Sequence, residues 1–298
     1  MEKDRIREIV REVVSGLLDE RKNPAERTEP PREGVFSSDP LFKRVALWAD
    51  RAVTAQPPSG KLWKPSADRD GYLKSTPARL GVGRTGTRYR TGTLMKFLAD
   101  HAAARDAVYS ELPDEIINGL KMTKLSSAAK DRAEFLRRPD LGRRLSDESR
   151  NIVASQFIKS PQVQIVAGDG LSAAALKMNL GIVIPALISE LAQARIKIGT
   201  LCYIRLARVA AGDETGLAAG ADVVCMLVGE RPGLKTAESM GAYIMYLKGA
   251  KRTDAQRSVV SNIHDNGIKP AEAGQIIAKL CLKILKAKKS GVDLGSKE

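Results

Sequence analysis

The run Val223–Val228 constrains the fold of this chain more than any other feature. Its six residues are all apolar, which is typical of a strand buried on both faces of a parallel sheet. The run ends in the loop Gly229–Gly233, whose sequence is Gly-Glu-Arg-Pro-Gly. Open α/β folds bind ligands at the carboxyl edge of such a sheet. The sequence therefore predicts an α/β domain with a ligand site at this edge.

The chain alternates between strand and helix patterns from about residue 160 onward. Further strands are predicted at Val163–Ala167, Ile198–Leu206, Tyr243–Leu247 and Val259–Ile263. Helices are predicted to begin at Ser172, at Val183 beyond Gly181, after Gly212 and at Pro270. Right-handed crossovers would place the carboxyl ends of all these strands on one edge. We therefore predict a Rossmann-like α/β domain over residues 156–298.

The N-terminal half is expected to be organised differently. Residues 1–20 predict an amphipathic helix, because apolar residues recur at helical spacing from Ile6 to Leu18. Residues 21–40 are rich in Pro, Glu, Arg and Ser and predict a disordered linker. Residues 41–155 predict a mostly helical region, with helices at Leu41–Ala55, at Thr93–Ala107, from Pro113 and from a cap at Ser146.

The N-terminal helix and its Pro-rich tether resemble the encapsulation peptides of enzymes carried inside bacterial microcompartments. The alternative is a helix that docks on the body of this protein or pairs between subunits. The amphipathic pattern fits both, since each needs one apolar face.

The formal net charge of +14 raises the question of nucleic-acid binding. The basic residues are scattered among 35 acidic ones and only 4% of residues are aromatic, so we expect no nucleic-acid partner. The densest basic stretch, Lys283–Lys289, predicts a solvated helix end or a surface for an acidic subunit. No apolar run approaches the roughly 20 residues of a bilayer span, so no membrane partner is expected.

The cysteines and histidines predict no metal or nucleophilic centre. Cys202, Cys225 and Cys281 are widely spaced in apolar sequence, which is typical of buried, reduced thiols. With only His101 and His264 beside them, they form no plausible zinc set. No Ser or Cys stands beside a base, so we expect no catalytic residue in this chain alone.

The turn Gly168–Ala173 offers an alternative function. It fits the Gly-x-Gly-x-x-Ala dinucleotide pattern, follows a predicted strand and opens a predicted helix. The alternative hypothesis for the function is therefore a nicotinamide-dependent oxidoreductase. Asp169 stands where a pyrophosphate should approach, however, and Arg205 takes the place of the expected ribose-binding acid.

A second set of residues falls at or near the ends of predicted strands and could share one cleft. The set comprises Arg205, Arg208, Val209, Gly229–Arg231, Val259, Ser261 and Asn262. Arginines suit a phosphate, whereas carbonyl and carboxylate oxygens suit amide N–H donors.

Five peptides occur in order between about Leu73 and the C-terminus. They are Gly83–Thr91, Arg138–Arg144, Asp169–Ser172, Val223–Gly233 and Ser261–His264. A string of unrelated peptides of this kind rarely recurs by chance. Together they resemble the small-subunit family of ethanolamine ammonia-lyase.

The resemblance implies an adenosylcobalamin-dependent lyase of ethanolamine catabolism, which converts ethanolamine to acetaldehyde and ammonia. It also implies a large subunit, whose TIM barrel binds most of the substrate, with cobalamin at the interface between subunits. Carried over to matching positions, the cobalamin contacts of this chain are Val209, Glu230 and Val259. We expect Glu230 to accept hydrogen bonds from corrin amides, and the valines to act through their backbone. The implied location is cytoplasmic, in the lumen of a bacterial microcompartment.

The peptide Asn262–Gly267 has a partial likeness to another class of cobalamin proteins. That class uses Asp-x-His-x-x-Gly, in which the histidine binds cobalt and the aspartate orients it. Here Asn262 replaces the aspartate, and the peptide comes late in the domain. We therefore expect His264 to be a loop or surface histidine and no metal ligand.

Overall fold

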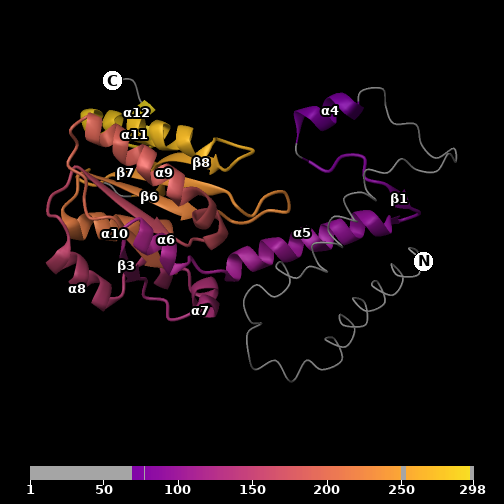
Figure 1. Ribbon diagram of the computed structural model, residues 1–298, viewed down its shortest axis with the longest axis horizontal. Coiled ribbons are helices and arrows are strands. Elements are labelled where there is room, and N and C mark those ends of the chain that lie inside the picture. The colour runs from indigo at the N-terminus through magenta and orange to yellow at the C-terminus, as the bar shows by residue number, and fades with distance from the viewer. Residues whose placement is uncertain (1–68, 77, 250–252, 296–298) are drawn as a thin grey trace. The chain divides into compact units, whose positions relative to one another are not determined.

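The structure is a computed structural model that describes residues 69–76, 78–249 and 253–295 (Figure 1). The helices expected at residues 1–20 and at Leu41–Ala55, and the linker expected at residues 21–40, lie outside the described residues. The described N-terminal elements are α4 (Arg69–Ser75), β1 (Arg84–Thr85), β2 (Arg88–Tyr89), α5 (Thr91–Tyr109), α6 (Asp114–Gly119), β3 (Thr123–Ser126), α7 (Arg132–Arg137), η2 (Leu141–Arg143) and α8 (Asp147–Gln156).

The remaining elements form most of the α/β core. They are β4 (Val163–Gly168), α9 (Ala173–Gln193), β5 (Cys202–Arg205), α10 (Val209–Ala219), β6 (Val223–Gly229), β7 (Met240–Tyr246), η3 (Asp254–Gln256), β8 (Ser258–Ile263), α11 (Pro270–Ala287) and α12 (Val292–Gly295). The strands predicted at Val163–Ala167 and Val223–Val228 and the helix predicted from Pro270 are confirmed. The strand predicted at Ile198–Leu206 is shorter than expected, because only Cys202–Arg205 pairs along the sheet.

The six main strands form one sheet in the order β3-β5-β4-β6-β7-β8. The first four are parallel, whereas β7 runs antiparallel to both of its neighbours. The α/β class is therefore confirmed with a parallel-rich sheet. The expectation that all carboxyl ends share one edge is wrong for β7. Residues 230–239, which join β6 to β7, contain no helix, and such a connection suits antiparallel strands.

The sheet extends into the region that we expected to be mostly helical. β3 belongs to residues 41–155 and pairs in parallel with β5 at the edge of the sheet. The helices expected there are confirmed where they are described: α5 is longer than predicted, α6 follows Pro113, and Ser146 caps α8 by accepting the Ser149 N–H. The sheet thus crosses the boundary that we expected at residue 156.

Helices cover both faces of the sheet (Figure 1). α9 and α11 pack on one face, and α8 and α10 pack on the other. Side chains along β4 alternate between them: Ile165 and Ala167 belong to the α9–α11 core, and Val166 to the α8–α10 core. The three cysteines are buried thiols, as expected, divided between these two cores.

α9 is one continuous helix, so the two helices expected on either side of Gly181 are a wrong prediction. Gly181 is exposed within the helix, and a Cβ there would meet nothing within 4 Å. α9 has 21 residues, and an 18-residue window within it has a mean hydropathy of 1.5, so by length and composition alone it could span a membrane, contrary to the expectation that no apolar run approaches that length. Its buried leucines pack between the sheet and α11, as in the core helix of a globular domain.

α10 begins at Val209, three residues before Gly212, whereas the helix was predicted to begin after that glycine. Gly212 lies inside the helix, where a Cβ would come within 3.0 Å of the Met226 side chain. A Cβ on Gly216, one turn later, would come within 2.5 Å of the Leu247 side chain. These glycines let α10 approach the sheet closely, and packing therefore overrides their low helix propensity.

Two helical glycines offer a matched test of this packing. A Cβ on Gly274 of α11 would lie 2.9 Å from the backbone oxygen of Val183 in α9, which cannot move aside easily. We expect Gly274→Ala to lower the free energy of unfolding by about 1–3 kcal/mol through overpacking. Gly181→Ala meets no such contact and should raise it by about 0.5–1 kcal/mol. Urea unfolding of both variants measures the difference, and equal effects would contradict this account of the α9–α11 contact.

Candidate functional site

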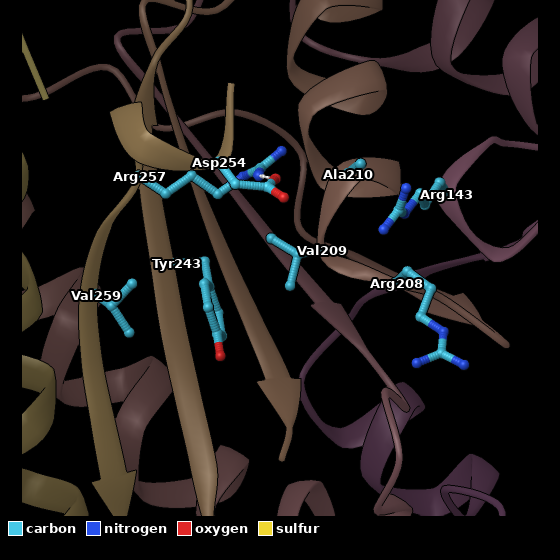
Figure 2. Close-up of a pocket in the computed structure, with 8 residues that line it drawn as sticks. All are labelled: Arg143, Arg208, Val209, Ala210, Tyr243, Asp254, Arg257 and Val259. Atoms are coloured by element: carbon cyan, nitrogen blue, oxygen red, sulfur yellow. Dashed lines mark hydrogen bonds and ion pairs between the residues drawn. The ribbon is translucent and has the colours of Figure 1, made fainter. Parts of the chain in front are cut away.

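A pocket opens between the start of α10 and the neighbouring strands β7 and β8 (Figure 2). Its volume is about 330 Å³. The residues that line it are Arg143, Arg208, Val209, Ala210, Tyr243, Asp254, Arg257 and Val259. Two of the three expected contact residues, Val209 and Val259, therefore line one pocket although 50 positions separate them in the sequence.

Val209 is the first residue of α10, and Arg208 at the N-cap makes no side-chain capping bond. The first N–H groups of a helix have no intrahelical acceptor and carry the positive end of its dipole. This end of the pocket therefore suits an acceptor or an anion.

Arg208 stands in a field of positive charge. Its guanidinium lies 4.4 Å from the centre of the Phe135 ring, and the Phe135 side chain is fully buried. Burial lowers the pKa of Arg208, and the charges of Arg143, Arg231 and Arg132 lower it further. Arg143 lines the pocket as well. An anionic ligand would relieve this repulsion between arginines.

Arg257 at the other side of the pocket is already neutralised. Its guanidinium forms ion pairs with Asp213 and Asp254, and only 8% of its side chain is exposed. These pairs tie η3 and the start of β8 to α10. We therefore assign Arg257 to holding the pocket together, and the anion preference to Arg208 and Arg143.

Tyr243 and Val259 form an apolar side of the pocket. They are paired neighbours on β7 and β8, and Figure 2 shows Val209 across from them. Val259 is 47% exposed. It is the second residue of β8 and lies on the face of the sheet. It thus lies near the end of a strand, as expected, but at the amino end of β8, where pairing with the antiparallel β7 brings it beside Tyr243.

Glu230 lies next to this pocket but does not line it. Its carboxylate accepts a hydrogen bond of 2.6 Å from the Ser239 hydroxyl and a longer one of 3.4 Å from the Asn262 N–H. A Cβ on Gly241 would lie 2.7 Å from Oε1, so the glycine makes room for the carboxylate. Burial raises the pKa of Tyr243, and the charge of Glu230 raises it further. The charge of Glu230 therefore acts on one residue that lines the pocket.

Arg205 does not line the pocket. Its guanidinium forms an ion pair of 2.5 Å with Glu111 beyond the end of β5. The shared cleft expected from the strand ends thus brings Arg208 and Val209 to Val259, but leaves Arg205 out. Sequence reasoning missed Arg143, Tyr243, Asp254 and Arg257. Arg143 lies in the peptide Arg138–Arg144, and the resemblance of that peptide to the family was the one available sign of its role.

The turn Gly168–Ala173 is closed. Gly170 has a φ of +57°, and a Cβ there would clash with the carbonyl oxygen of Gly229, which accepts the Leu171 N–H at 3.0 Å. Ser172 caps α9 by accepting the Ala175 N–H, and its hydroxyl donates to the Ala237 carbonyl. Protein atoms thus occupy the space that a pyrophosphate would need, so the geometry does not favour the nicotinamide reading.

His264 is a loop residue as expected, but it is buried, with 9% exposure, and not at the surface. One ring nitrogen pairs with Asn262 Oδ1 at 2.8 Å, and the other accepts the Asn266 N–H. Both ring nitrogens therefore serve the turn. Within residues 69–76, 78–249 and 253–295, no group of three His, Cys, Asp or Glu side chains could hold a metal ion.

Comparison with known proteins gives a consistent result. The sequence model of the family described as ethanolamine ammonia-lyase light chain matches residues 69–295. Three relatives carry the name ethanolamine ammonia-lyase small subunit. The protein from Clostridium perfringens is 46% identical over 231 residues, which cover 76% of this chain and 78% of the relative. That from Lachnoclostridium phytofermentans is 47% identical over 224 residues (75% and 76%), and that from Listeria monocytogenes 44% over 231 residues (76% and 79%).

The proximity of Glu230 to Tyr243 can be tested by titration. We expect Glu230→Gln to lower the pKa of Tyr243 toward its ordinary value of about 10, because a negative neighbour is removed. In the wild type the folded-state pKa is the higher one, so the neutral phenol favours folding below pH 10. That contribution is lost as the pH rises through the folded-state pKa. Ultraviolet titration of tyrosinate, assigned with Tyr243→Phe, measures the shift, and unchanged titration would contradict the contact.

Proposed function

Because this chain belongs to the ethanolamine ammonia-lyase light-chain family, we propose that it is the small subunit of an adenosylcobalamin-dependent lyase that converts ethanolamine to acetaldehyde and ammonia. The pocket beside α10 is its contribution to the cobalamin site. Bound adenosylcobalamin supplies the radical chemistry, and the residues of this chain bind and orient it. Ethanolamine is held mainly by a large partner subunit, and no catalytic residue is assigned to this chain.

The observation that carries the proposal is the combination of an apolar wall with uncompensated positive charge in one pocket. Val209, Tyr243 and Val259 supply apolar surface for the edge of a corrin. The phosphate of the nucleotide loop suits Arg208, Arg143 and the N–H groups at the start of α10. The residues present therefore fit a large, mostly apolar ligand with a single anionic group.

Glu230 is proposed to receive the amides of the corrin rim. Ser239 and Asn262 hold its carboxylate beside Tyr243, and a carboxylate offers about four acceptor sites, of which these partners use two. Val209 and Val259 act through backbone atoms and apolar contact. α9 connects β4 to β5 on one face of the sheet, and α10 connects β5 to β6 on the other face. These two connections between parallel strands support describing residues 156–298 as Rossmann-like.

The partner surface of this chain is proposed to include α5. Of the large hydrophobic side chains that are exposed in the described residues, most lie in residues 69–109. They are Tyr72, Leu73, Leu80, Tyr89, Leu94, Phe97, Leu98 and Tyr109, against Ile158, Met178, Ile182, Leu217, Val259 and Val292 elsewhere. The buried residues of α5 are all small: Gly92, Ala99 and Ala107. A helix that buries no large side chain is usually stabilised by a partner.

The large subunit is the occupant that fits this surface, which we call the α5 patch (residues 69–109). The segment carries eight Lys and Arg against three Asp, so it suits an acidic partner surface. A second copy of this chain is disfavoured, since each copy has a net charge of +14. Residues 1–68 are a poorer candidate, because the family match includes the patch but begins at residue 69.

Residues 1–20 are proposed to contact a microcompartment shell, which would put the enzyme in the lumen of that compartment in the cytoplasm. The support is the amphipathic pattern and the Pro-rich stretch after it. The matched segment of the family starts well beyond both.

The proposed function is tested with the complex of this chain and a large subunit from a related operon, co-expressed and purified. The complex should release acetaldehyde from ethanolamine only with adenosylcobalamin, and the isolated chain should be inactive. Arg143→Met should weaken adenosylcobalamin binding about tenfold or more, because a charged hydrogen bond contributes about 1.5–3 kcal/mol.

The neighbouring Arg144 provides the matched control. Arg144 is also exposed, but it lies beside Asp140 and does not line the pocket. We expect Arg144→Met to bind the cofactor as the wild type does. A complex that never turns over ethanolamine would contradict the function, and equal effects of the two variants would contradict the assignment of the pocket.

The α5 patch is tested by assembly. Phe97→Ser replaces a side chain that is 42% exposed on α5, and Ile182→Ser replaces one that is 49% exposed on α9. We expect only Phe97→Ser to weaken co-purification with the large subunit, by about 1–3 kcal/mol in binding free energy, since it removes an aromatic interface contact. Equal assembly of both variants would show that the patch has another occupant or none.

A further inference from the structure

The segment Leu206–Arg208, between β5 and α10, has an unusual backbone. Leu206 has a φ of +57°, in the left-handed region that a buried leucine rarely adopts. Such a conformation persists only where surrounding contacts impose it. Val209 follows directly as the first residue of α10 and lines the pocket. The conformation of Leu206 therefore determines where α10 and its first N–H groups begin.

A buried carboxylate imposes this conformation. Oδ2 of Asp169 accepts the backbone N–H of Leu206 at 2.9 Å, and Asp169 is fully buried. The same oxygen accepts the guanidinium of Arg132 at 3.1 Å, while Oδ1 accepts the hydroxyl of Tyr203. Asp169 is thus satisfied on both oxygens, and it comes from the turn after β4, a different part of the chain.

The other end of the segment is fixed as well. The N–H of Arg208 donates to the carbonyl oxygen of Gly142 at 2.7 Å. Arg208 stacks on one buried ring, Phe135, with Arg132 also within 5.3 Å of that ring. The arginine that pairs with Asp169 therefore shares its aromatic neighbour with the arginine that lines the pocket. Asp169 is thus linked to the pocket wall in two ways: by its hydrogen bond to the Leu206 N–H, and by its pairing with Arg132, which shares the Phe135 ring with Arg208.

We propose that Asp169 is a positioning residue for the ligand site: it holds Leu206 in the left-handed conformation and so sets Arg208 and the start of α10 for the anionic group of the ligand. The inference rests on the proposed function, since the ligand is taken to be adenosylcobalamin. Asp169 is fully buried and does not line the pocket. The Gly-Asp-Gly turn, which resembles a dinucleotide loop, thereby acquires a different role: its acid supports the neighbouring loop.

The test compares variants in the complex with the large subunit, by absorbance titration with adenosylcobalamin. Asp169→Ala removes both acceptor oxygens, including the one that accepts the Leu206 N–H. We expect the dissociation constant to rise about tenfold to a hundredfold, the range typical of residues that support a direct ligand contact. Turnover at saturating cofactor should be retained, because the change affects binding geometry and no reacting atom.

Two controls separate positioning from a general loss of stability. Tyr203→Phe removes another hydrogen bond to Asp169 but leaves the Leu206 bond, so it should change the affinity little. Ile165→Ala weakens the same strand, β4, on the face covered by α9. We expect it to lower the melting temperature and leave the dissociation constant near the wild-type value.

Each outcome bears on the inference. Should Asp169→Ala fail to assemble, Asp169→Glu keeps the charge opposite Arg132 but displaces the oxygens by one methylene, and it should also bind the cofactor more weakly. Wild-type affinity for adenosylcobalamin in an assembled Asp169 variant would overturn this inference but not the proposed function. The same holds if both control variants lose as much affinity as the Asp169 variant. A wild-type complex that binds no corrinoid would overturn the proposed function, and this inference with it.

Discussion

Burial of β4 and β6 on both faces is the constraint on which the rest of the structure depends. Every residue of both strands is buried between the α9–α11 layer and the α8–α10 layer. Burying one large aliphatic side chain contributes about 1.5–3 kcal/mol, so these two strands hold much of the stability of the domain. Ligand-binding groups are consequently confined to the ends of these strands and to the less buried strands beside them.

The carboxyl ends of β4 and β6 are themselves closed by this packing. A Cβ on Gly170 would clash with the carbonyl oxygen of Gly229, and Asp169 is enclosed by Tyr203, Arg132 and the Leu206 N–H. The usual crevice of an open α/β sheet is therefore filled with protein groups. The pocket lies to one side of it, between α10 and the β7–β8 pair, where the sheet becomes antiparallel. Electrostatics favour an anion there, because the arginines around Arg208 repel one another.

Local sequence patterns predicted the features that local physics determines. The apolar run of β6, the cap at Ser146 and the proline at the start of α11 all specified their elements correctly. Gly181 and Gly212 misled, because a glycine within a helix looks the same in sequence whether it ends the helix or packs against a neighbour. β3 was missed, since four residues with the sequence Thr-Lys-Leu-Ser show no clear period.

The candidate site was predictable only in part, because tertiary contacts bring several of its residues together. Val209 and Val259 line one pocket, as their positions near predicted strand ends suggested, but Tyr243 and Arg257 come together with them only through the antiparallel pairing of β7 and β8. No sequence pattern near Tyr243 reports that pairing. The support from Asp169 is likewise a tertiary contact, between residues 37 positions apart.

Amide hydrogen exchange on the assembled complex, with and without adenosylcobalamin, tests the central claim most directly. At the start of α10 the Arg208 and Ala211 N–H groups already have backbone acceptors, so a bound anion should slow the exchange of the Val209 and Ala210 N–H groups. We predict protection of residues 209–210 and of residues 257–261, with little change in the closed turn at 168–173. Protection confined to residues 168–173, or none around the pocket while cofactor is bound, would contradict the account.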